Sequence, residues 1–331
     1  MKNSDSNFVE GLRDQVFTGR PTTREEALRL YDAPLEILAE NADMIRQRFC
    51  GNDFDLCAIV NAKSGRCHEN CKFCAQSSHY PTDCEVFPLI SVDAMVEEAK
   101  RVWSKGVLRF SFVTSGRKIS SEELDAICEA ARRIRNETQL EVCGSLGLLT
   151  EQEFKRLFDA GLTRIHNNLE TSRRFFPQIC TTHTYDDKIA ALRAARSAGM
   201  SLCSGGIFGL GETPEDRVDM AMTLRELGVK SVPINIFVAI PGSPLSRPTL
   251  KSLTSADAKR IVAVYRFILP DASIRLAGGR KLLEDKGFGC FHSGANATIT
   301  GDMLTTSGID ILTDVSAVQS FGYELKLRND R

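Results

Sequence analysis

The sequence predicts an α/β protein built on a (βα)8 barrel of the TIM type, with a helical extension before it. From about residue 51 to about residue 300, short β-branched apolar runs alternate with longer amphipathic stretches, a pattern typical of strands that alternate with helices. There are eight such runs, which is the number of strands in this barrel. The alternation alone also allows an open, doubly wound sheet.

The length of 331 residues, 42% of them hydrophobic, suits one large barrel as well as two smaller domains. Residues 1–50 are expected to form the helical extension, because the stretch 33–49 is amphipathic. The barrel is expected over residues 51–310, and residues 311–331 are expected to be a C-terminal tail.

Each predicted strand is a short run that is rich in β-branched and apolar residues. In chain order the eight runs are 56–62, 107–113, 140–146, 163–170, 201–207, 231–237, 273–279 and 295–300.

The helices between these strands have recognisable starts and ends. Ser120 with Glu123 matches the capping box, and so does Thr150 with Glu153. Pro214 follows Thr213 and stands at the first position of another helix. The helices are expected to end close to glycines, namely Gly106, Gly161, Gly199 and Gly228.

Charge and composition exclude several classes of function. The net charge is −1 and no polybasic stretch is present, so nucleic acid and anionic membranes are poor candidates as partners. The N-terminal residues contain no apolar export segment, and no apolar run approaches the length of a membrane span. The chain is therefore expected in the cytoplasm, where its eleven cysteines stay reduced.

Three cysteines are clustered directly after the first predicted strand. Cys67, Cys71 and Cys74 stand at spacings of four and three residues. Zinc with a nearby histidine as the fourth ligand is one interpretation, and a disulfide is a weaker one. The third is a [4Fe–4S] cluster with one open iron. The mouth of a barrel, where loops follow the strands, is the place for chemistry, and this favours the reactive cluster.

The spacing CxxxCxxC, with Phe73 before the last cysteine, resembles the signature of the radical S-adenosylmethionine enzymes. The resemblance implies that Cys67, Cys71 and Cys74 hold the [4Fe–4S] cluster. It also implies that the open iron binds S-adenosylmethionine and that one electron splits this cofactor into methionine and a 5′-deoxyadenosyl radical.

Within that superfamily the chain is similar to the biotin synthases over roughly residues 50–300. The motifs HNNLETS, TTHTY, CSGGIFGLGET, SVPINIF, PGSPL, IRLAGGR and SGAN follow the triplet in the family's order. The similarity implies that sulfur from a second, sacrificial iron–sulfur cluster is inserted into dethiobiotin to give biotin.

The similarity also assigns binding residues. It implies that Asn168 and Glu170 reach the ribose of S-adenosylmethionine, although the family more often has aspartate at the second place. It implies that the stretch 205–212, with Gly206, Ile207 and Glu212, lies on the adenine side. It further implies that Asn235 binds the ureido ring of dethiobiotin. No catalytic residue is expected beyond the cluster ligands.

The second cluster shows a departure from the family. Cys143, Cys203 and Arg275 stand at three of its usual ligand positions, but Ser111 stands at the fourth. Serine replaces a thiolate poorly on iron, so Cys57 on the neighbouring strand is expected to compensate. Arg275 or Ser293 would complete the site, with Cys290 as a further candidate. The cluster is then either [2Fe–2S] or a larger four-iron form; otherwise Cys57 is a buried apolar side chain.

The remaining cysteines, Cys50, Cys84, Cys128 and Cys180, are expected to have no chemical role, and His166, His183 and His292 are expected to be structural. The resemblance further implies an electron donor of the flavodoxin or ferredoxin type, cluster-assembly proteins and a homodimer. The alternative function is another radical enzyme, of the hydrogenase-maturation or methylornithine synthase type, that inserts no sulfur. An iron–sulfur electron carrier is a further alternative, but it would not need the nucleotide-binding motifs.

Overall fold

Strand β1 closes the sheet into a barrel. In the computed structural model, which describes residues 2–247 and 250–328, β1 (Asp53–Lys63) pairs in parallel with β2 (Arg109–Thr114) on one side. On its other side it pairs in parallel with β9 (Ala297–Thr300). A doubly wound sheet would leave these strands unpaired at two edges. The predicted (βα)8 barrel is therefore confirmed, and the open sheet is wrong.

The intervening strands follow the predicted order, with one break. The fifth predicted run is split into β5 and β6, and β6 pairs with β7 alone. At the break a Cβ on Gly205 would lie 2.0 Å from the carbonyl oxygen of Pro233, so only glycine lets the chain approach β7 this closely. The strands are β3 (Glu141–Ser145), β4 (Leu162–His166), β5 (Ser201–Cys203), β6 (Gly206–Phe208), β7 (Ser231–Ile236) and β8 (Ser273–Leu276).

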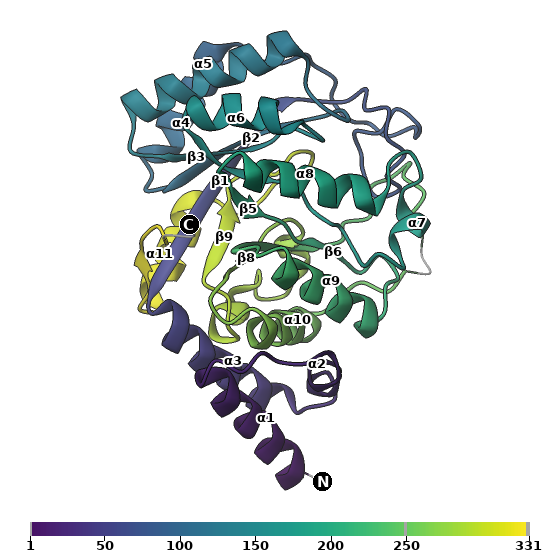
Figure 1. Cartoon of the computed structure of the whole chain (residues 1–331), viewed down its shortest axis with the longest axis vertical. Coiled ribbons are helices and arrows are strands. Elements are labelled where there is room, and N and C mark those ends of the chain that lie inside the picture. The colour runs from purple at the N-terminus through teal and green to yellow at the C-terminus, as the bar shows by residue number, and fades with distance from the viewer. Residues whose placement is uncertain (1, 248–249, 329–331) are drawn as a thin grey trace.

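Helices alternate with the strands and surround the barrel (Figure 1). The short helix α7 (Phe176–Ile179) and the 3-10 turns η1 (Arg280–Leu282) and η2 (Phe288–His292) interrupt this alternation near the mouth and near the last strand. The longer helices are α4 (Val92–Trp103), α5 (Ser121–Glu137), α6 (Glu151–Asp159), α8 (Tyr185–Ser197), α9 (Pro214–Glu226) and α10 (Ser255–Ile268).

The predicted helix starts are present. The hydroxyl of Ser120 accepts a hydrogen bond from the backbone N–H of Glu123 at 3.2 Å, and the Glu123 carboxylate accepts one from the N–H of Ser120 at 2.9 Å. Thr150 and Glu153 form the same capping box, and Pro214 stands in the first turn of α9. These reciprocal bonds satisfy N–H groups that have no partner inside the helix.

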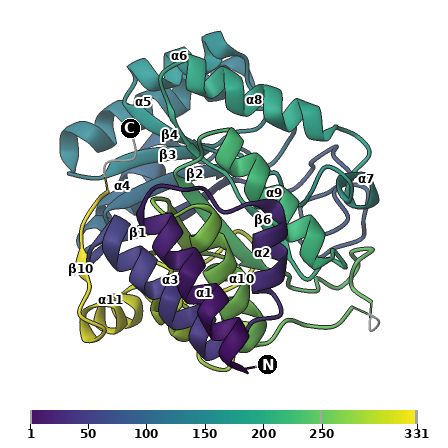
Figure 2. The same cartoon turned by 60° about the horizontal axis from the view of Figure 1, so that its bottom comes forward.

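The N-terminal residues form three helices against the outside of the barrel. Helix α3 (Leu35–Cys50) packs against both α1 (Lys2–Phe17) and α10, and α2 (Arg24–Leu30) packs against α9. Figure 2 shows this helical group in front of α10. Helix α3 ends at Cys50, directly before β1, the first strand of the barrel.

The C-terminal residues also pack onto the barrel. Strand β10 (Glu324–Leu325) pairs in parallel with the start of β1, and α11 (Ile311–Ser320) precedes it. On the same helix Asp314 is fully buried and forms an ion pair with Arg280 at 2.9 Å. This segment therefore has fixed contacts with the core.

The core is the apolar layer between the strands and the helices, and it is formed by their buried aliphatic and aromatic side chains. None of the helices in residues 2–247 and 250–328 combines the length and the apolar character that a membrane span requires.

Candidate active site at the mouth of the barrel

A cavity of about 400 Å³ extends from the loop that carries the cysteine triplet into the barrel. Ser111 and the guanidinium-bearing residues Arg109 and Arg164 also line it. The cavity brings together most of the residues that the sequence singled out, namely Cys57, Cys67, Cys71, Cys74, Cys143, Asn168, Glu170, Cys203, Ile207, Asn235 and Arg275. Gly206, Glu212 and Ser293 are not in its lining.

The triplet lies on the loop of residues 64–80, here called the triplet loop, which follows β1. Backbone bonds fold it back on itself: Cys67 N–H donates to the carbonyl of Gln76 at 3.0 Å, and Cys74 N–H donates to that of Cys71 at 3.0 Å. All three thiols are partly exposed toward the cavity. Three thiols on one folded loop suit a cluster that keeps one iron open.

The triplet loop is fastened to the segment between α7 and α8. The amide oxygen of Asn70 accepts hydrogen bonds from the backbone N–H groups of Thr181 and Thr182 at 2.9 and 3.2 Å. Lys72 N–H donates to the carbonyl of Ile179 at 2.9 Å. These bonds hold the triplet loop against the segment between α7 and α8.

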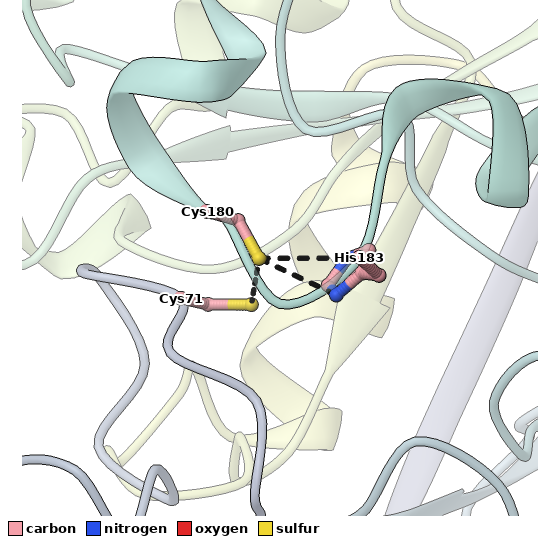
Figure 3. A group of neighbouring side chains, drawn as sticks. All are labelled: Cys71, Cys180 and His183. Carbon is pink, nitrogen blue, oxygen red and sulfur yellow. Dashed lines mark hydrogen bonds between the residues drawn. The ribbon is translucent and has the colours of Figure 1, made fainter.

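The fastening brings Cys180 and His183 beside Cys71 (Figure 3), which corrects the expectation that Cys180 has no partner. The Sγ atoms of Cys71 and Cys180 lie 3.7 Å apart, and Cys180 Sγ lies 3.3 Å from His183 Nδ1. The hydrogen bond from Cys71, with that from His183, lowers the pKa of the Cys180 thiol, and the same bond raises the pKa of Cys71. Only spatial proximity reveals this group, because 109 residues separate the two cysteines.

Asn168 and Glu170 form the next part of the cavity wall, where the chain leaves β4. The side-chain oxygen of Asn168 accepts a hydrogen bond from Gly205 N–H at 3.0 Å. Glu170 has φ +70°, a conformation that a non-glycine residue adopts only when its surroundings hold it there. Its Oε2 atom is buried and has no hydrogen-bond partner among the described residues. A carboxylate held in this way is ready for a hydroxyl donor from a ligand.

Gly206 and Glu212 support this wall from behind. A Cβ on Gly206 would lie 2.4 Å from the carbonyl oxygen of Glu170, so the glycine permits the close contact. The Glu212 carboxylate accepts hydrogen bonds from Gly209 N–H and Leu210 N–H at 2.9 and 2.8 Å and pairs with Arg217 at 2.8 Å. Glu212 thus closes the turn after β6, and Ile207 alone of the three adenine-side residues lines the cavity.

Asn235 on β7 lines the cavity next to Ile207, its neighbour in the β6–β7 register, with its amide already engaged. Its Nδ2 donates to the carbonyl of Gly206 at 3.0 Å, and its oxygen accepts from Gly278 N–H at 3.0 Å. The side chain therefore joins β7 to the segments that follow β5 and β8.

Three buried thiols from different strands line the deep part of the cavity, here called its floor. Cys57 lies on β1, Cys143 on β3 and Cys203 on β5, and all three line the cavity. Cys57 thus points into the barrel, as its expected part beside Ser111 requires. Burial raises the pKa of the Cys57 thiol to about 12 and also raises that of Cys143, so a metal must displace their protons when it binds.

Ser111 lines the cavity and Ser293 does not. Ser111 lies opposite Cys143 in the β2–β3 register and lines the cavity. Ser293 is buried at the end of η2, and its hydroxyl donates to the carbonyl of Gly289 at 3.0 Å. Cys290 also lies in η2, within the apolar core. Neither Ser293 nor Cys290 lines the cavity, and their part as ligands of the deep cluster stays a prediction.

A buried charge cluster below the thiols was not predicted. Asp55 on β1 is fully buried and lies 2.9 Å from Arg275, 3.3 Å from Arg109 and 3.6 Å from Arg164. Burial alone would raise the pKa of Asp55, but the three guanidinium groups hold it well below its usual range. Asp55 stands directly before the predicted strand 56–62, and the structure extends that strand back to Asp53, so this charge lies inside the barrel wall and needs buried partners.

His166 lies beside the deep thiols. Its Nδ1 atom is 3.4 Å from Cys203 Sγ. Burial lowers the pKa of His166 to about 4, so the imidazole is neutral at physiological pH and adds no charge to the floor of the cavity.

Comparison with known families identifies two regions. Residues 62–224 match the family described as "Radical SAM superfamily", and residues 233–324 match the "Biotin and Thiamin Synthesis associated domain". The chain is 56% identical to "Biotin synthase 2" of Corynebacterium diphtheriae, with 97% of each chain covered. It is 53% identical to "Biotin synthase" of Brachyspira hyodysenteriae, with 97% of this chain and 96% of that protein covered.

Two solved structures share the architecture. Methylornithine synthase superposes with a TM-score of 0.83 at 19% identity and covers 96% of this chain and 97% of its own. HydG, a maturase of the [FeFe]-hydrogenase, superposes with a TM-score of 0.80 at 17% identity, covering 98% of this chain and 76% of its own. Identities this low show the shared barrel fold alone.

Proposed function

The chain belongs to the biotin synthases of the radical S-adenosylmethionine superfamily, and we propose which of its residues serve each part of the reaction. The reaction is the radical insertion of sulfur into dethiobiotin to give biotin. The alternative, a radical enzyme of the hydrogenase-maturation or methylornithine synthase type, is not supported, because those structures share only the fold with this chain.

Cys67, Cys71 and Cys74 hold the [4Fe–4S] cluster in this proposal. With S-adenosylmethionine bound, the cluster supplies the one-electron cleavage that yields methionine and the 5′-deoxyadenosyl radical. The triplet loop positions these cysteines, because its folded backbone and its bonds to residues 178–182 hold the three thiols at the mouth of the barrel.

Asn168 and Glu170 hold the ribose of the cofactor. The buried Oε2 atom of Glu170, which has no partner among the described residues, supports this assignment, since a diol supplies the missing donors. Ile207 lies at the adenine side of the same wall. Gly206 and Glu212 act as positioning residues, because they shape the backbone next to Glu170 and do not line the cavity.

Dethiobiotin lies between the mouth and the floor of the cavity, beside Asn235. Since one N–H and one oxygen lone pair of the Asn235 amide are engaged with Gly206 and Gly278, its second N–H and second lone pair remain for the ureido group. The largely apolar lining around it, which includes Ile59, Val113 and Ile299, suits the aliphatic part of the substrate.

The auxiliary cluster is bound at the floor by Cys57, Cys143 and Cys203. Three inward thiols fit a soft iron site, and Arg275, which lines the same cavity, is the candidate for a fourth position. Asp55 holds the Arg275 guanidinium at 2.9 Å, so Arg275 is anchored from below. Such a cluster supplies the sulfur, whether it is [2Fe–2S] or a larger four-iron form.

Cleavage of S-adenosylmethionine consumes one electron, so a donor of the flavodoxin or ferredoxin type is proposed. Loss of sulfur from the auxiliary cluster requires cluster-assembly proteins. A homodimer is proposed on family resemblance. A cytoplasmic location is proposed because thiolate-held clusters require a reducing compartment.

The observation that carries the proposal is the single cavity that joins the triplet to the deep thiols. The test uses anaerobically reconstituted protein with reductant, S-adenosylmethionine and dethiobiotin. Cys67→Ala should abolish both 5′-deoxyadenosine and biotin, whereas Cys143→Ala should abolish biotin only, because the mouth cluster is intact. Biotin formation by the Cys143→Ala variant at the unchanged rate would contradict the proposal.

A further inference from the structure

A compact group of metal-ligating side chains joins one cysteine of the triplet to two residues that have no part in the reaction described above. The ligand atoms of Cys71, Cys180 and His183 all lie within 4.8 Å of one another. Figure 3 shows the three side chains converging from the triplet loop and from the segment that follows α7. Cys180 and His183 are buried and Cys71 is half-buried.

The surrounding backbone holds this arrangement in place. Asn70 next to Cys71 bonds to Thr181 and Thr182, and the Lys72 Nζ donates to the carbonyl of Gln178 at 2.7 Å. Cys71 and Cys180 are therefore held together by neighbours on both sides. A site that is formed before the metal arrives avoids much of the ordering cost of binding.

Glu69 completes the group. Its carboxylate lies 2.5 Å from His183 Nδ1 and is itself mostly buried. Because Glu69 holds Nδ1, the nitrogen left for a metal is Nε2, which lies 3.9 Å from Cys180 Sγ. A carboxylate on one ring nitrogen is the usual support for an imidazole that binds a metal through the other, because it fixes the orientation of the ring. Two thiols, one imidazole and an adjacent carboxylate or water are the ligand set of a tetrahedral zinc site.

We propose that Cys71, Cys180 and His183 form a mononuclear Zn²⁺ site that is available only while the chain lacks its [4Fe–4S] cluster. Binding would displace protons from the thiols, which then ligate as thiolates. Mg²⁺ and Ca²⁺ are excluded because they prefer oxygen ligands, and Zn²⁺ binds such sites more tightly than Fe²⁺ does.

The shared residue makes the two metal centres mutually exclusive. Cys71 cannot ligate the zinc and also serve as one of the three cluster thiolates. Zinc at this site is therefore expected to block cluster assembly, through Cys180 and His183 and not through the other two triplet cysteines. This property goes beyond the proposed reaction, since neither Cys180 nor His183 is assigned a part in it.

The test uses the full-length, reduced, cluster-free protein under anaerobic conditions, with Co²⁺ as a spectroscopic probe. One Co²⁺ per chain should bind with the absorption bands of tetrahedral thiolate ligation, and Zn²⁺ should displace it. Cys180→Ser and His183→Ala should each weaken Co²⁺ binding at least about tenfold, the minimum expected when a ligand is lost. Circular dichroism verifies that each variant is folded, and the two variants are independent of each other.

Two controls locate the metal. Cys67→Ala removes a cluster ligand but leaves the proposed zinc site whole, so its Co²⁺ affinity should be unchanged. Cys203→Ser removes a thiol at the floor of the cavity and should also have no effect. If Cys67→Ala or Cys203→Ser weakens Co²⁺ binding while Cys180→Ser does not, the metal lies elsewhere and the proposal is overturned.

The consequence for cluster assembly is tested separately. Preincubation with Zn²⁺ should prevent reconstitution of the [4Fe–4S] cluster in the unmodified protein and not in the Cys180→Ser variant, as read from iron content and absorption. Equal inhibition of both proteins would overturn the proposal. Without zinc, Cys180→Ser should assemble its cluster and cleave S-adenosylmethionine as the unmodified protein does; failure there in both proteins would instead count against the proposed reaction.

Discussion

Asp55 and Cys57 lie two residues apart on β1 and face the same buried floor with different chemistry. The carboxylate of Asp55 balances part of the charge of Arg109, Arg164 and Arg275. Cys57 supplies a thiol above it, in the cavity lining.

Removal of the Cys57 thiol is expected to affect sulfur insertion but not the cleavage of S-adenosylmethionine. Cys57→Ala should lower the iron and sulfide content to that of the mouth cluster and reduce biotin formation to background. Cleavage of S-adenosylmethionine should continue, because the triplet is intact. Iron and sulfide analysis with Mössbauer spectra measures the first effect, and product assays measure the second.

Ser111→Ala is the matched control, because Ser111 lines the same cavity and its hydroxyl is a poor iron ligand. It should retain most of the biotin formation. A Cys57→Ala variant that keeps its full iron and sulfide and still makes biotin would show that Cys57 is a buried apolar side chain only.

Asp55→Asn is expected to destabilise the fold by about 3–5 kcal/mol, since it leaves buried arginine charge without its partner. The pKa of the folded carboxyl lies below its unfolded value of about 3.9. Its stabilising contribution is thus present above that value and is lost as the pH falls into the acid range. Urea unfolding between about pH 7 and pH 3 should show a smaller acid-induced loss in the variant.

Asp53→Asn on the same strand is the control, because its partner Lys326 is 62% exposed. A surface pair of this kind contributes only about 0–1 kcal/mol. Equal destabilisation by the two substitutions would show that the buried arginines do not depend on Asp55.

At the scale of elements, the split of the fifth barrel strand into β5 and β6 shapes the cofactor wall. Gly205 and Gly206 lie at the break and let β7 and the Glu170 backbone approach. Asn168 bonds to Gly205 and Glu170 forms a bridge to Gly206. The break therefore joins the end of β4 to the start of β6.

Gly206→Ala is expected to weaken S-adenosylmethionine binding. The new Cβ would lie 2.4 Å from the Glu170 carbonyl and 2.6 Å from the Met220 side chain, so Glu170 must shift. A displacement of about 1 Å can cost up to about 100-fold in rate, and we expect a loss of about 10- to 100-fold in kcat/KM for the cofactor. Gly11→Ala, in α1 with nothing within 4 Å of the added Cβ, should leave kcat/KM unchanged. A Gly206→Ala variant with unaltered cofactor kinetics would refute this role for the break.

At the scale of the whole molecule, segments from both ends of the chain complete the barrel. Helix α3 packs on α10, and β10 extends the sheet beside β1. Tyr323, next to β10, packs edge-on against Phe54 with 5.3 Å between the ring centroids. The first strand is thus held by the helical extension before it and by the C-terminal segment beside it.

Asp314→Asn tests how strongly the C-terminal segment is attached. Arg280 and Asp314 form two hydrogen bonds, at 2.9 and 3.0 Å, in a fully buried setting. Loss of the carboxylate charge should lower the free energy of unfolding by about 3–5 kcal/mol, measured by urea titration. Leu312→Ala on the same helix, where the leucine is 55% exposed, should change it by no more than about 0.5 kcal/mol. A similar small effect of Asp314→Asn would mean that α11 contributes little to the stability of the barrel.

The sequence alone determined the barrel, its capped helices and the grouping of the triplet, because strand and helix periods and the spacing within one loop are local properties. Alternation along a strand puts Cys57 and Ile59 on one face, and the structure shows that this face lines the cavity. Resemblance to the family supplied the roles of Asn168, Glu170 and Asn235.

Only the tertiary structure decided which distant residues meet. Cys71 and Cys180 are 109 residues apart, and Asp55 bonds to a guanidinium 220 residues away. Strand register and loop docking set these contacts, and neither has a periodic signal in the sequence. For the same reason Ser293, close to the last strand in the chain, lies outside the cavity, because the 3-10 turn before that strand directs its hydroxyl to Gly289.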